Sequence, residues 1–332
     1  MEAAILAGGL GIRTVKETQF AVSLGRIETM STLFAVVIPT LNAADDWPRF
    51  VSHLSSSIPA DRILVLDSSS TDGTADLART AKFRVHTIAR AEFNHGGTRQ
   101  LAADLLPEAD VLVFLTQDAV LAGPDAINKL LEPFADSNVA AAFGRQLPRV
   151  GATPIETHAR IFNYSKQSDI RILRSREQLG FKAIFISNSF AAYRREALMA
   201  VGGFPREVIF GEDTITAARL LLSGWKIAYV AEAQVYHSHS YSWMQDFKRY
   251  FDIGVLHARE SWLLQEFGST GGEGSRFVRS ELNFLWPRHW WFIPSALIRT
   301  ALKLVGYRLG RIENKLSVKW KRRLSMHHRF WN

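Results

Sequence analysis

The first half of the chain alternates short apolar runs with polar loops and segments of helical spacing. Each apolar run has the length of a buried parallel strand, and each amphipathic segment after it has the length of a covering helix. The expected strands lie within residues 33–43, 61–70, 84–90 and 111–119, and the expected helices within residues 74–82, 98–106 and 125–135. This alternation predicts an α/β, Rossmann-like fold: a mostly parallel sheet with helices on both faces and a ligand crevice where the strands end.

The pattern changes twice further along the chain. After about residue 145 the alternation loosens, which predicts a part that caps the crevice. From residue 241 the pattern is helical and rich in Trp, Phe, Lys and Arg, and a second apparent start lies at Met30. We therefore predict a domain at residues 30–240 and a basic, amphipathic helical region at residues 241–332, with residues 1–29 as an extension outside the domain.

Composition narrows the choice of partner and compartment. The 332 residues are 47% hydrophobic and 22% charged, as in an ordinary globular protein, and the net charge of +8 favours an anionic partner. With no Cys, disulfides and thiolate chemistry are excluded, and a reducing, cytoplasmic location is expected. The sequence shows neither a signal peptide nor the uncharged apolar stretch of about 18 residues that a spanning helix needs.

A glycine-rich stretch near the start points to a different activity. AILAGGLGIRT at residues 4–14 resembles the signature of sugar-1-phosphate nucleotidyltransferases, in which backbone N–H groups and an Arg hold a triphosphate. The Lys that those enzymes need after the loop has no counterpart in ETQFAVSLGRIE. We expect residues 1–29 to be a remnant or the product of an upstream start, disordered or loosely docked, and keep a nucleotidyltransferase as an alternative function.

Polar residues cluster where the expected strands end. The carboxylate of Asp67 suits a nucleotide base or ribose, or else it is a turn residue. Arg99, near the start of a helix, suits a diphosphate or a solvated helix face. Asp118 after the next strand suits a divalent cation, or again a turn.

Two further groups are candidates for chemistry. Glu212 and Asp213 follow Gly211 at the start of an expected helix, where they are either favourable partners of the helix dipole or a general base with its neighbour. His237 and His239 follow an apolar run, and strand spacing would place both rings on one face, for a metal, a phosphate or a structural role.

These motifs in their order resemble one family. VVIPTLN, LDSSSTDGT, HGGTRQ, FLTQDA, GED and YHSH are together similar to the inverting family 2 glycosyltransferases with the GT-A fold. GYRLGR at residues 306–311 and SMHHRFW at residues 325–331 resemble its bacterial rhamnosyltransferase branch. The resemblance extends from Phe34 to the end of the chain.

The resemblance implies a role for each site residue. Asp213 matches the general base, and Asp118 matches the last acid of a metal-binding Asp-x-Asp whose first position here is Thr116. His237 and His239 are expected to complete a site for Mg²⁺ or Mn²⁺. Ser68 stands where many relatives have a second acid. The expected nucleotide-sugar-binding residues are Pro39, Thr40, Asn42, Asp67, Ser69, Arg99, Gln117, Asp118 and Glu212.

The implied reaction is displacement at the anomeric carbon of a nucleotide-sugar, with inversion. The expected donor is dTDP-β-L-rhamnose, and the acceptor is a hydroxyl of a glycan or lipid-linked sugar in cell-surface polysaccharide synthesis, such as lipopolysaccharide. Asp213 would deprotonate that hydroxyl while Arg99 and the metal stabilise the departing diphosphate.

The tail from Trp286 mixes aromatic residues with Lys and Arg. Its charge forbids a spanning helix but suits an amphipathic helix at an anionic membrane surface, so a peripheral location at the inner face of the cell membrane is expected. A solvated basic helix packed on the catalytic domain is the alternative. A nucleic-acid-binding protein is a rival class, disfavoured because the acids gather in one crevice and no nucleic-acid-binding motif is present.

Overall fold

A computed structural model describes residues 33–55, 58–268 and 271–331. The extension expected at residues 1–29, with its glycine-rich stretch, lies outside the described residues. The strands are β1 (Phe34–Thr40), β2 (Ile63–Asp67), β3 (Arg84–Thr87), β4 (Val111–Leu115), β5 (Val120–Leu121), β6 (Val139–Leu147), β7 (Asp169–Arg171), β8 (Phe190–Arg194) and β9 (Lys226–Tyr236). The helices are α1 (Trp47–Ser55), α2 (Thr74–Thr80), α3 (His95–Leu105), α4 (Ala126–Leu131), α5 (Pro154–Asn163), α6 (Arg176–Leu179), α7 (Arg195–Ala200), α8 (Glu212–Leu222), α9 (Trp243–Arg259), α10 (Ser261–Phe267), α11 (Gly271–Leu285), α12 (Ile293–Arg311) and α13 (Val318–Leu324).

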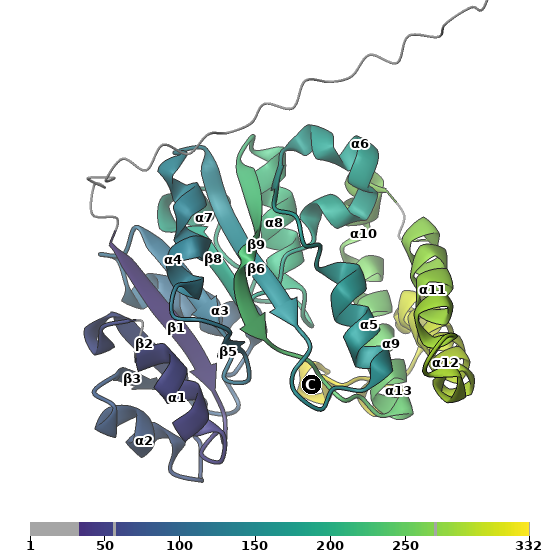
Figure 1. The fold of residues 1–332 in the computed structure, drawn as a ribbon, viewed down its shortest axis with the longest axis horizontal. Coiled ribbons are helices and arrows are strands. Elements are labelled where there is room, and N and C mark those ends of the chain that lie inside the picture. The colour runs from purple at the N-terminus through teal and green to yellow at the C-terminus, as the bar shows by residue number, and fades with distance from the viewer. Residues whose placement is uncertain (1–32, 56–57, 269–270, 332) are drawn as a thin grey trace, which may run out of the picture. The chain divides into compact units, whose positions relative to one another are not determined.

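The strands form one mixed sheet in the order β3-β2-β1-β4-β8-β6-β9-β5, with β7 paired to β9 (Figure 1). Pairing is parallel from β3 through β4 and again between β6 and β9. Strand β8 runs antiparallel to β4 and β6, and β5 and β7 run antiparallel to β9. The parallel strands expected in the first half of the chain are therefore present, and the loosened pattern after residue 145 corresponds to the mixed half of the sheet.

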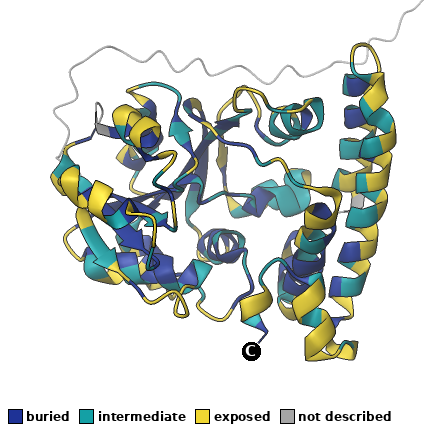
Figure 2. Ribbon diagram, turned by 90° about the horizontal axis from the view of Figure 1, so that it is seen from below, coloured by how far each residue is buried: buried dark blue, intermediate teal, exposed yellow. Residues whose placement is uncertain are grey.

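Helices cover both faces of the sheet, as expected. Successive strand residues point to opposite faces, so Val37 packs into a core with α3, α7 and α8, whereas Val36 packs into a second core with α1 and α4. Buried residues concentrate in the sheet and on the inner sides of these helices (Figure 2). The sheet packs between two apolar cores, and this packing fixes the positions of the polar residues that follow each strand.

Helix starts are set by local capping groups. Helix α3 begins at His95, earlier than the expected residue 98, because the side chain of Asn94 accepts a hydrogen bond from Gly97 N at 2.9 Å. Helix α9 begins with a capping box in which Ser242 and Gln245 satisfy each other's backbone N–H groups.

The C-terminal helices complete one compact unit with the sheet. Helix α12 crosses α9 at close range because Gly306 and Gly310 have no Cβ atoms. A Cβ atom at either position would overlap the carbonyl oxygen of Phe247 or Phe251. The glycines of GYRLGR therefore serve helix packing. Among the residues that the structure describes, every helix is too short or too polar to cross a bilayer.

Candidate active site

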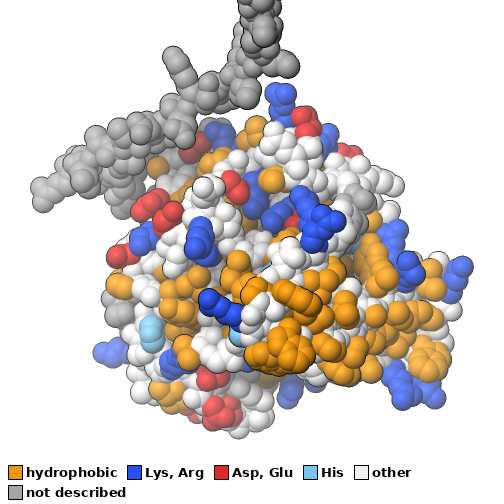
Figure 3. Space-filling model, turned by 45° about the vertical axis from the view of Figure 1, so that its right-hand side comes forward, with side chains coloured by type: hydrophobic (Ala, Val, Ile, Leu, Met, Phe, Trp, Pro, Cys, Tyr) orange, Lys and Arg blue, Asp and Glu red, His pale blue; other side chains and the backbone are white. Residues whose placement is uncertain are grey.

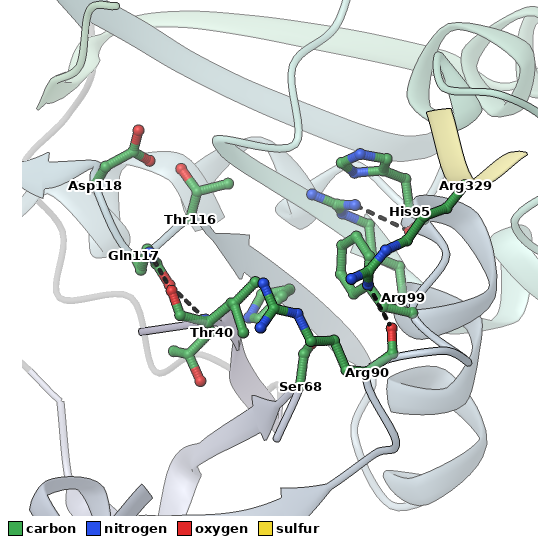
Figure 4. A pocket seen from close by; sticks show the side chains of 12 residues that line it. Thr40, Ser68, Arg90, His95, Arg99, Thr116, Gln117, Asp118 and Arg329 are labelled. Carbon is green, nitrogen blue, oxygen red and sulfur yellow. Dashed lines mark hydrogen bonds between the residues drawn. The ribbon is translucent and has the colours of Figure 1, made fainter. Parts of the chain in front are cut away.

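A cavity of about 360 Å³ lies at the carboxyl ends of β1, β2 and β4, where the sequence predicts a ligand crevice (Figure 4). Thr116, Gln117 and Asp118 stand on one side of it, and Arg90, Arg99 and Arg329 on the other. Its lining consists of Pro39, Thr40, Leu41, Ser68, Arg90, Phe93, His95, Arg99, Thr116, Gln117, Asp118 and Arg329. Five of the expected nucleotide-sugar-binding residues are among these: Pro39, Thr40, Arg99, Gln117 and Asp118.

Asp67 supports the wall of the cavity from behind. Its buried carboxylate accepts hydrogen bonds from Ser70 N at 3.0 Å, Ser70 Oγ at 2.5 Å and Thr40 Oγ1 at 3.3 Å. With its oxygens engaged in this way, Asp67 holds the loop after β2, and the adjacent Ser68 lines the cavity instead.

Asn42 and Ser69 also shape this wall without lining the cavity. Asn42 Oδ1 accepts a hydrogen bond from Thr71 N at 3.0 Å, and Ser69 Oγ donates to Ile88 O at 2.8 Å. Both residues have positive φ angles, 48° and 57°, so the two loops adopt tight turns held by side-chain hydrogen bonds.

Gln117 joins two of the strand ends. Its side-chain amide accepts from Leu41 N at 2.8 Å and donates to Leu41 O at 3.2 Å. This pair of bonds locks the loop after β4 to the loop after β1, so that Asp118 is held at a fixed place on the rim.

Asp118, His237 and His239 form a group whose ligand atoms all lie within 4.8 Å of one another. Asp118 Oδ2 is 3.3 Å from His237 Nε2 and 3.7 Å from His239 Nδ1. Strand β9 ends at Tyr236, so the strand spacing expected for the two histidines was wrong. Their rings nevertheless meet edge to face, with centroids 4.5 Å apart, beside the same carboxylate.

The hydrogen bonds around His237 fit a metal ligand. Gln146 Nε2 donates to Ser187 Oγ at 3.0 Å, which turns Gln146 Oε1 toward His237 Nδ1 at 2.9 Å. With the amide oriented this way, His237 Nδ1 is the donor to Gln146 Oε1, and Nε2 faces Asp118, where it could bind a metal ion. A carboxylate with two imidazoles is a donor set that Mn²⁺ accepts more readily than Mg²⁺ does.

The surroundings keep Asp118 ionised. Burial acts to raise the pKa of Asp118, but the hydrogen bond and the charge of His237 outweigh it and hold that pKa well below its usual range. Burial lowers the pKa of His239 to about 4, so this imidazole is neutral at pH 7. An ionised carboxylate beside a neutral imidazole is the state in which both bind a metal.

The acids at the start of α8 have different partners. Gly211, in the left-handed region with φ 80°, turns the chain so that Glu212 and Asp213 begin the helix. Glu212 is buried, with Oε1 at 3.0 Å from both Arg99 Nη1 and Asn188 Nδ2. Burial opposes the ionisation of Glu212, but the Arg99 guanidinium lowers its pKa. The charge of Arg99 is therefore compensated within the protein, although its side chain lines the cavity.

Asp213 is placed for proton transfer near neutral pH. Thr214 N donates to Asp213 Oδ1 at 2.7 Å, and Asn188 N lies 3.4 Å from Oδ2. Burial and the negative charge of Glu212 raise the pKa of Asp213 to about 7. Asp213 is not among the lining residues, but the next residue after Asn188, Ser189, accepts a hydrogen bond from Thr116 N at 3.3 Å. Asp213, on α8, thus contacts a residue whose chain neighbour is bonded to the loop that carries Asp118.

Several residues of this site were not predicted from the sequence to bind a ligand. The strand-end argument that selected Asp67 and Asp118 applies equally to Ser68 and Thr116, which line the cavity. Asn188 contacts both acids of α8, and its own Oδ1 accepts from Tyr193 Oη at 2.8 Å. Nothing in the local sequence marks Asn188, and the motif SMHHRFW that contains Arg329 gives no sign that it reaches this site, because both residues arrive only through the tertiary fold.

The fold is similar to that of a solved enzyme. A mannosyltransferase from Pyrobaculum calidifontis, solved in complex with GDP-Man and Mn²⁺, superposes with a TM-score of 0.53 at 18% identity, covering 90% of this chain and 84% of the other. The likeness shows the GT-A fold, as the sequence predicts.

The family follows from sequence comparison. The family model described as "Glycosyltransferase like family 2" matches residues 31–251. The O-antigen chain rhamnosyltransferase RfbN of Salmonella typhimurium is 45% identical over 299 residues, which cover 90% of this chain and 95% of the relative. WbaN of Salmonella anatum, also an O-antigen chain rhamnosyltransferase, is 44% identical over 303 residues, 90% and 96% of the two chains. The chain belongs to glycosyltransferase family 2, in the branch that holds these relatives, and is a glycosyltransferase; the resemblance of its motifs is confirmed.

Proposed function

We propose that the enzyme transfers L-rhamnose from dTDP-β-L-rhamnose, with inversion, to a hydroxyl of a glycan or lipid-linked acceptor in cell-surface polysaccharide synthesis. The observation that carries the proposal is Asp213 at the start of α8: its pKa is raised to about 7, and it contacts Asn188, whose chain neighbour Ser189 is bonded to Thr116 in the crevice. The choice of rhamnose rests on the two Salmonella relatives, which match over nearly their whole length.

The proposed reaction is a single displacement. Asp213 takes the proton of the acceptor hydroxyl as its oxygen bonds to the anomeric carbon from the face opposite the leaving group. The bond between that carbon and the phosphate oxygen breaks, and its electron pair leaves with the nucleoside diphosphate. A carboxylate with a pKa near the working pH is well matched to this step, because it is both substantially ionised and basic enough to accept the proton.

We assign the divalent metal to Asp118, His237 and His239, whose arrangement fits such an ion. When bound there, Mn²⁺ or Mg²⁺ supplies positive charge for the diphosphate of the donor. The protein's own part is to keep Asp118 ionised and to orient His237 through Gln146. Asp67 and its neighbours would hold the loop against which the nucleoside packs.

A membrane-facing surface is proposed for the C-terminal helices. Trp286, Trp290 and Trp291, between α11 and α12, expose 73%, 64% and 57% of their surface, and Leu297 and Leu304 on α12 are also exposed. Figure 3 shows hydrophobic side chains gathered on this side of the molecule, with Lys and Arg around them. Exposed Trp flanked by cations suits the headgroup region of an anionic bilayer, the inner face of the cell membrane, where a lipid-linked acceptor would be presented.

A donor panel tests the reaction. The enzyme is incubated with dTDP-β-L-rhamnose, UDP-glucose or GDP-mannose, a panel of lipid-linked acceptors and Mn²⁺, and release of nucleoside diphosphate and glycosylated product are measured. We expect product only from dTDP-β-L-rhamnose. NMR of that product should show that the anomeric configuration is inverted relative to the donor. Product from another donor alone would overturn the assignment of the sugar, and retained configuration would overturn the single displacement.

Vesicle sedimentation tests the surface. We expect binding to phosphatidylglycerol vesicles, weakened by Trp290→Ser with Trp291→Ser and by salt, and unchanged by Leu77→Ser, an exposed apolar residue on α2. Equal binding of all variants would remove this surface as the membrane contact.

Two other results would favour the rival functions. A salt-sensitive electrophoretic shift with RNA or DNA, in place of nucleotide binding, would favour a nucleic-acid-binding protein. Release of pyrophosphate from dTTP or CTP and a sugar phosphate would favour a nucleotidyltransferase.

A further inference from the structure

The motif SMHHRFW, at residues 325–331, folds back onto the donor cavity. Met326 N donates to Asp252 Oδ2 at 2.9 Å, and the ring of His327 stacks on Phe210, with centroids 5.8 Å apart and planes inclined by 16°. The same imidazole meets His95, a cavity residue, edge to face at 5.0 Å. The start of the segment is therefore fixed beside the cavity.

The end of the segment is anchored independently. Trp331 is buried, with the Arg259 guanidinium and the Lys321 ammonium each 5.0 Å from its ring. Arg322 Nε donates to Trp331 O at 2.7 Å. Between the two anchors, residues 328–330 form a short turn of 3₁₀ helix, which holds Arg329 in place.

Arg329 points its charge into the cavity. Its Nη1 donates to Arg90 O at 3.2 Å, and the residue lines the cavity with His95 and Arg99, far from it in sequence (Figure 4). Among the residues that the structure describes, no carboxylate lies within ion-pair distance of Arg329, whereas Arg99 is paired with Glu212 at 3.0 Å.

The imidazoles around Arg329 add no positive charge. Burial lowers the pKa of His327 to about 3 and also lowers the pKa of His95, so both rings are neutral at pH 7. Among the residues that line the cavity, Arg329 and Arg90 therefore carry the positive charge that no carboxylate of the described residues compensates. A polar cavity with such charge suits an anionic ligand, and a planar guanidinium suits phosphate oxygens in particular.

We propose that residues 325–331 complete the donor site and that Arg329 binds the diphosphate of the nucleotide-sugar. The inference rests on the proposed function, because it takes the cavity to be the donor site. Arg329 then shares with Asp118 and its metal the task of holding a diphosphate whose negative charge grows as the sugar departs.

The test compares a ligand with phosphates and one without. Binding of dTDP is measured by calorimetry and binding of thymidine by ligand-observed NMR, for wild type, Arg329→Ala, Arg329→Lys and the control Arg323→Ala. Arg323 lies on the neighbouring α13, over the ring of Trp320, and does not line the cavity. We expect Arg329→Ala to weaken the affinity for dTDP by about ten- to a hundredfold, the range of a charge-assisted hydrogen bond. The affinity for thymidine should change little.

Each outcome separates the possible roles. Partial recovery with Arg329→Lys and an unchanged Arg323→Ala support the proposal, because they show a need for charge at this one position. If Arg329→Ala loses affinity for dTDP and thymidine equally, Arg329 only supports the wall of the cavity and the proposal is overturned. Unchanged dTDP binding in Arg329→Ala would also overturn the proposal. If wild type binds neither dTDP nor UDP, the proposed donor site itself fails.

Discussion

Asp118 and Asp213 are two carboxylates of the proposed site with opposite surroundings. Asp118 stands beside two imidazoles, and its pKa is held low despite burial. Asp213 stands beside the ionised Glu212 in a partly buried place, and its pKa is raised to about 7. One carboxylate is thereby suited to holding a cation at every working pH, and the other to exchanging a proton near neutrality. The residue type alone gives neither role, because the neighbours set both.

The largest expected effect comes from removing the base. Asp213→Asn keeps the shape of the side chain but cannot accept a proton, so kcat for sugar transfer should fall about 10³-fold, within the range of general base catalysis. Nucleotide binding, measured by calorimetry, should be largely unchanged. Asp76→Asn, the same change on the exposed face of α2, is the control and should leave kcat unaltered. Substantial turnover by Asp213→Asn would remove this residue as the base.

Removing the cation-binding carboxylate should have a different signature. Asp118→Asn leaves the two imidazoles without an anionic partner, so the affinity for dTDP in Mn²⁺ should fall about tenfold or more. In EDTA, wild type and variant should bind dTDP alike, because the difference between them requires the metal. A loss of equal size in EDTA would show that Asp118 acts without a metal.

A smaller effect is expected from changing a residue that contacts a proposed metal ligand but is not itself one. Gln146→Leu removes the acceptor that orients His237 but leaves all three ligand side chains in place. Loss of such an outer partner should weaken Mn²⁺ binding about tenfold, measured by titration of Mn²⁺ in the presence of dTDP. If Mn²⁺ affinity is unchanged, the orientation of His237 does not depend on Gln146.

The smallest change sharpens the comparison without removing either carboxylate. Glu212→Gln deletes the negative charge next to Asp213 and leaves Arg99 unpaired, and both changes favour the ionised form of Asp213. The acidic limb of the pH profile of kcat/KM should therefore shift to lower pH, by about one unit. The midpoint is read independently of the absolute rate, so partial destabilisation does not hide it. An unmoved midpoint would show that Glu212 does not set the pKa of Asp213.

Local sequence predicted those parts of the site that depend on strand ends. Apolar runs located β1, β2 and β4, and the rule that ligands bind at their carboxyl ends led to Asp118, which lines the cavity. Thr40 and Gln117, which the family resemblance implied, line it as well. The same rule could not tell that Asp67 bonds to its own loop while Ser68 lines the cavity, because the two differ only in how the turn closes.

Long-range pairing was beyond the reach of the sequence pattern. Arg99 was expected to meet a diphosphate, and its burial against Glu212 depends on the packing of α3 near α8. Asn188 and Arg329 reach the site from the mixed half of the sheet and from the end of the chain, and no periodicity encodes those contacts. The direction of each pKa shift likewise depends on such neighbours, so the roles of the two carboxylates came from family resemblance and not from spacing.

The pH dependence of kcat/KM for the wild-type enzyme tests the central claim most directly, because this ratio reports ionisation in the free enzyme. Protonated Asp213 cannot act as the base, so activity should rise with pH and level off. The account predicts a midpoint near 7, the raised pKa of Asp213. A profile flat from pH 5 to 8, or a midpoint near the usual carboxyl value of about 4, would contradict it.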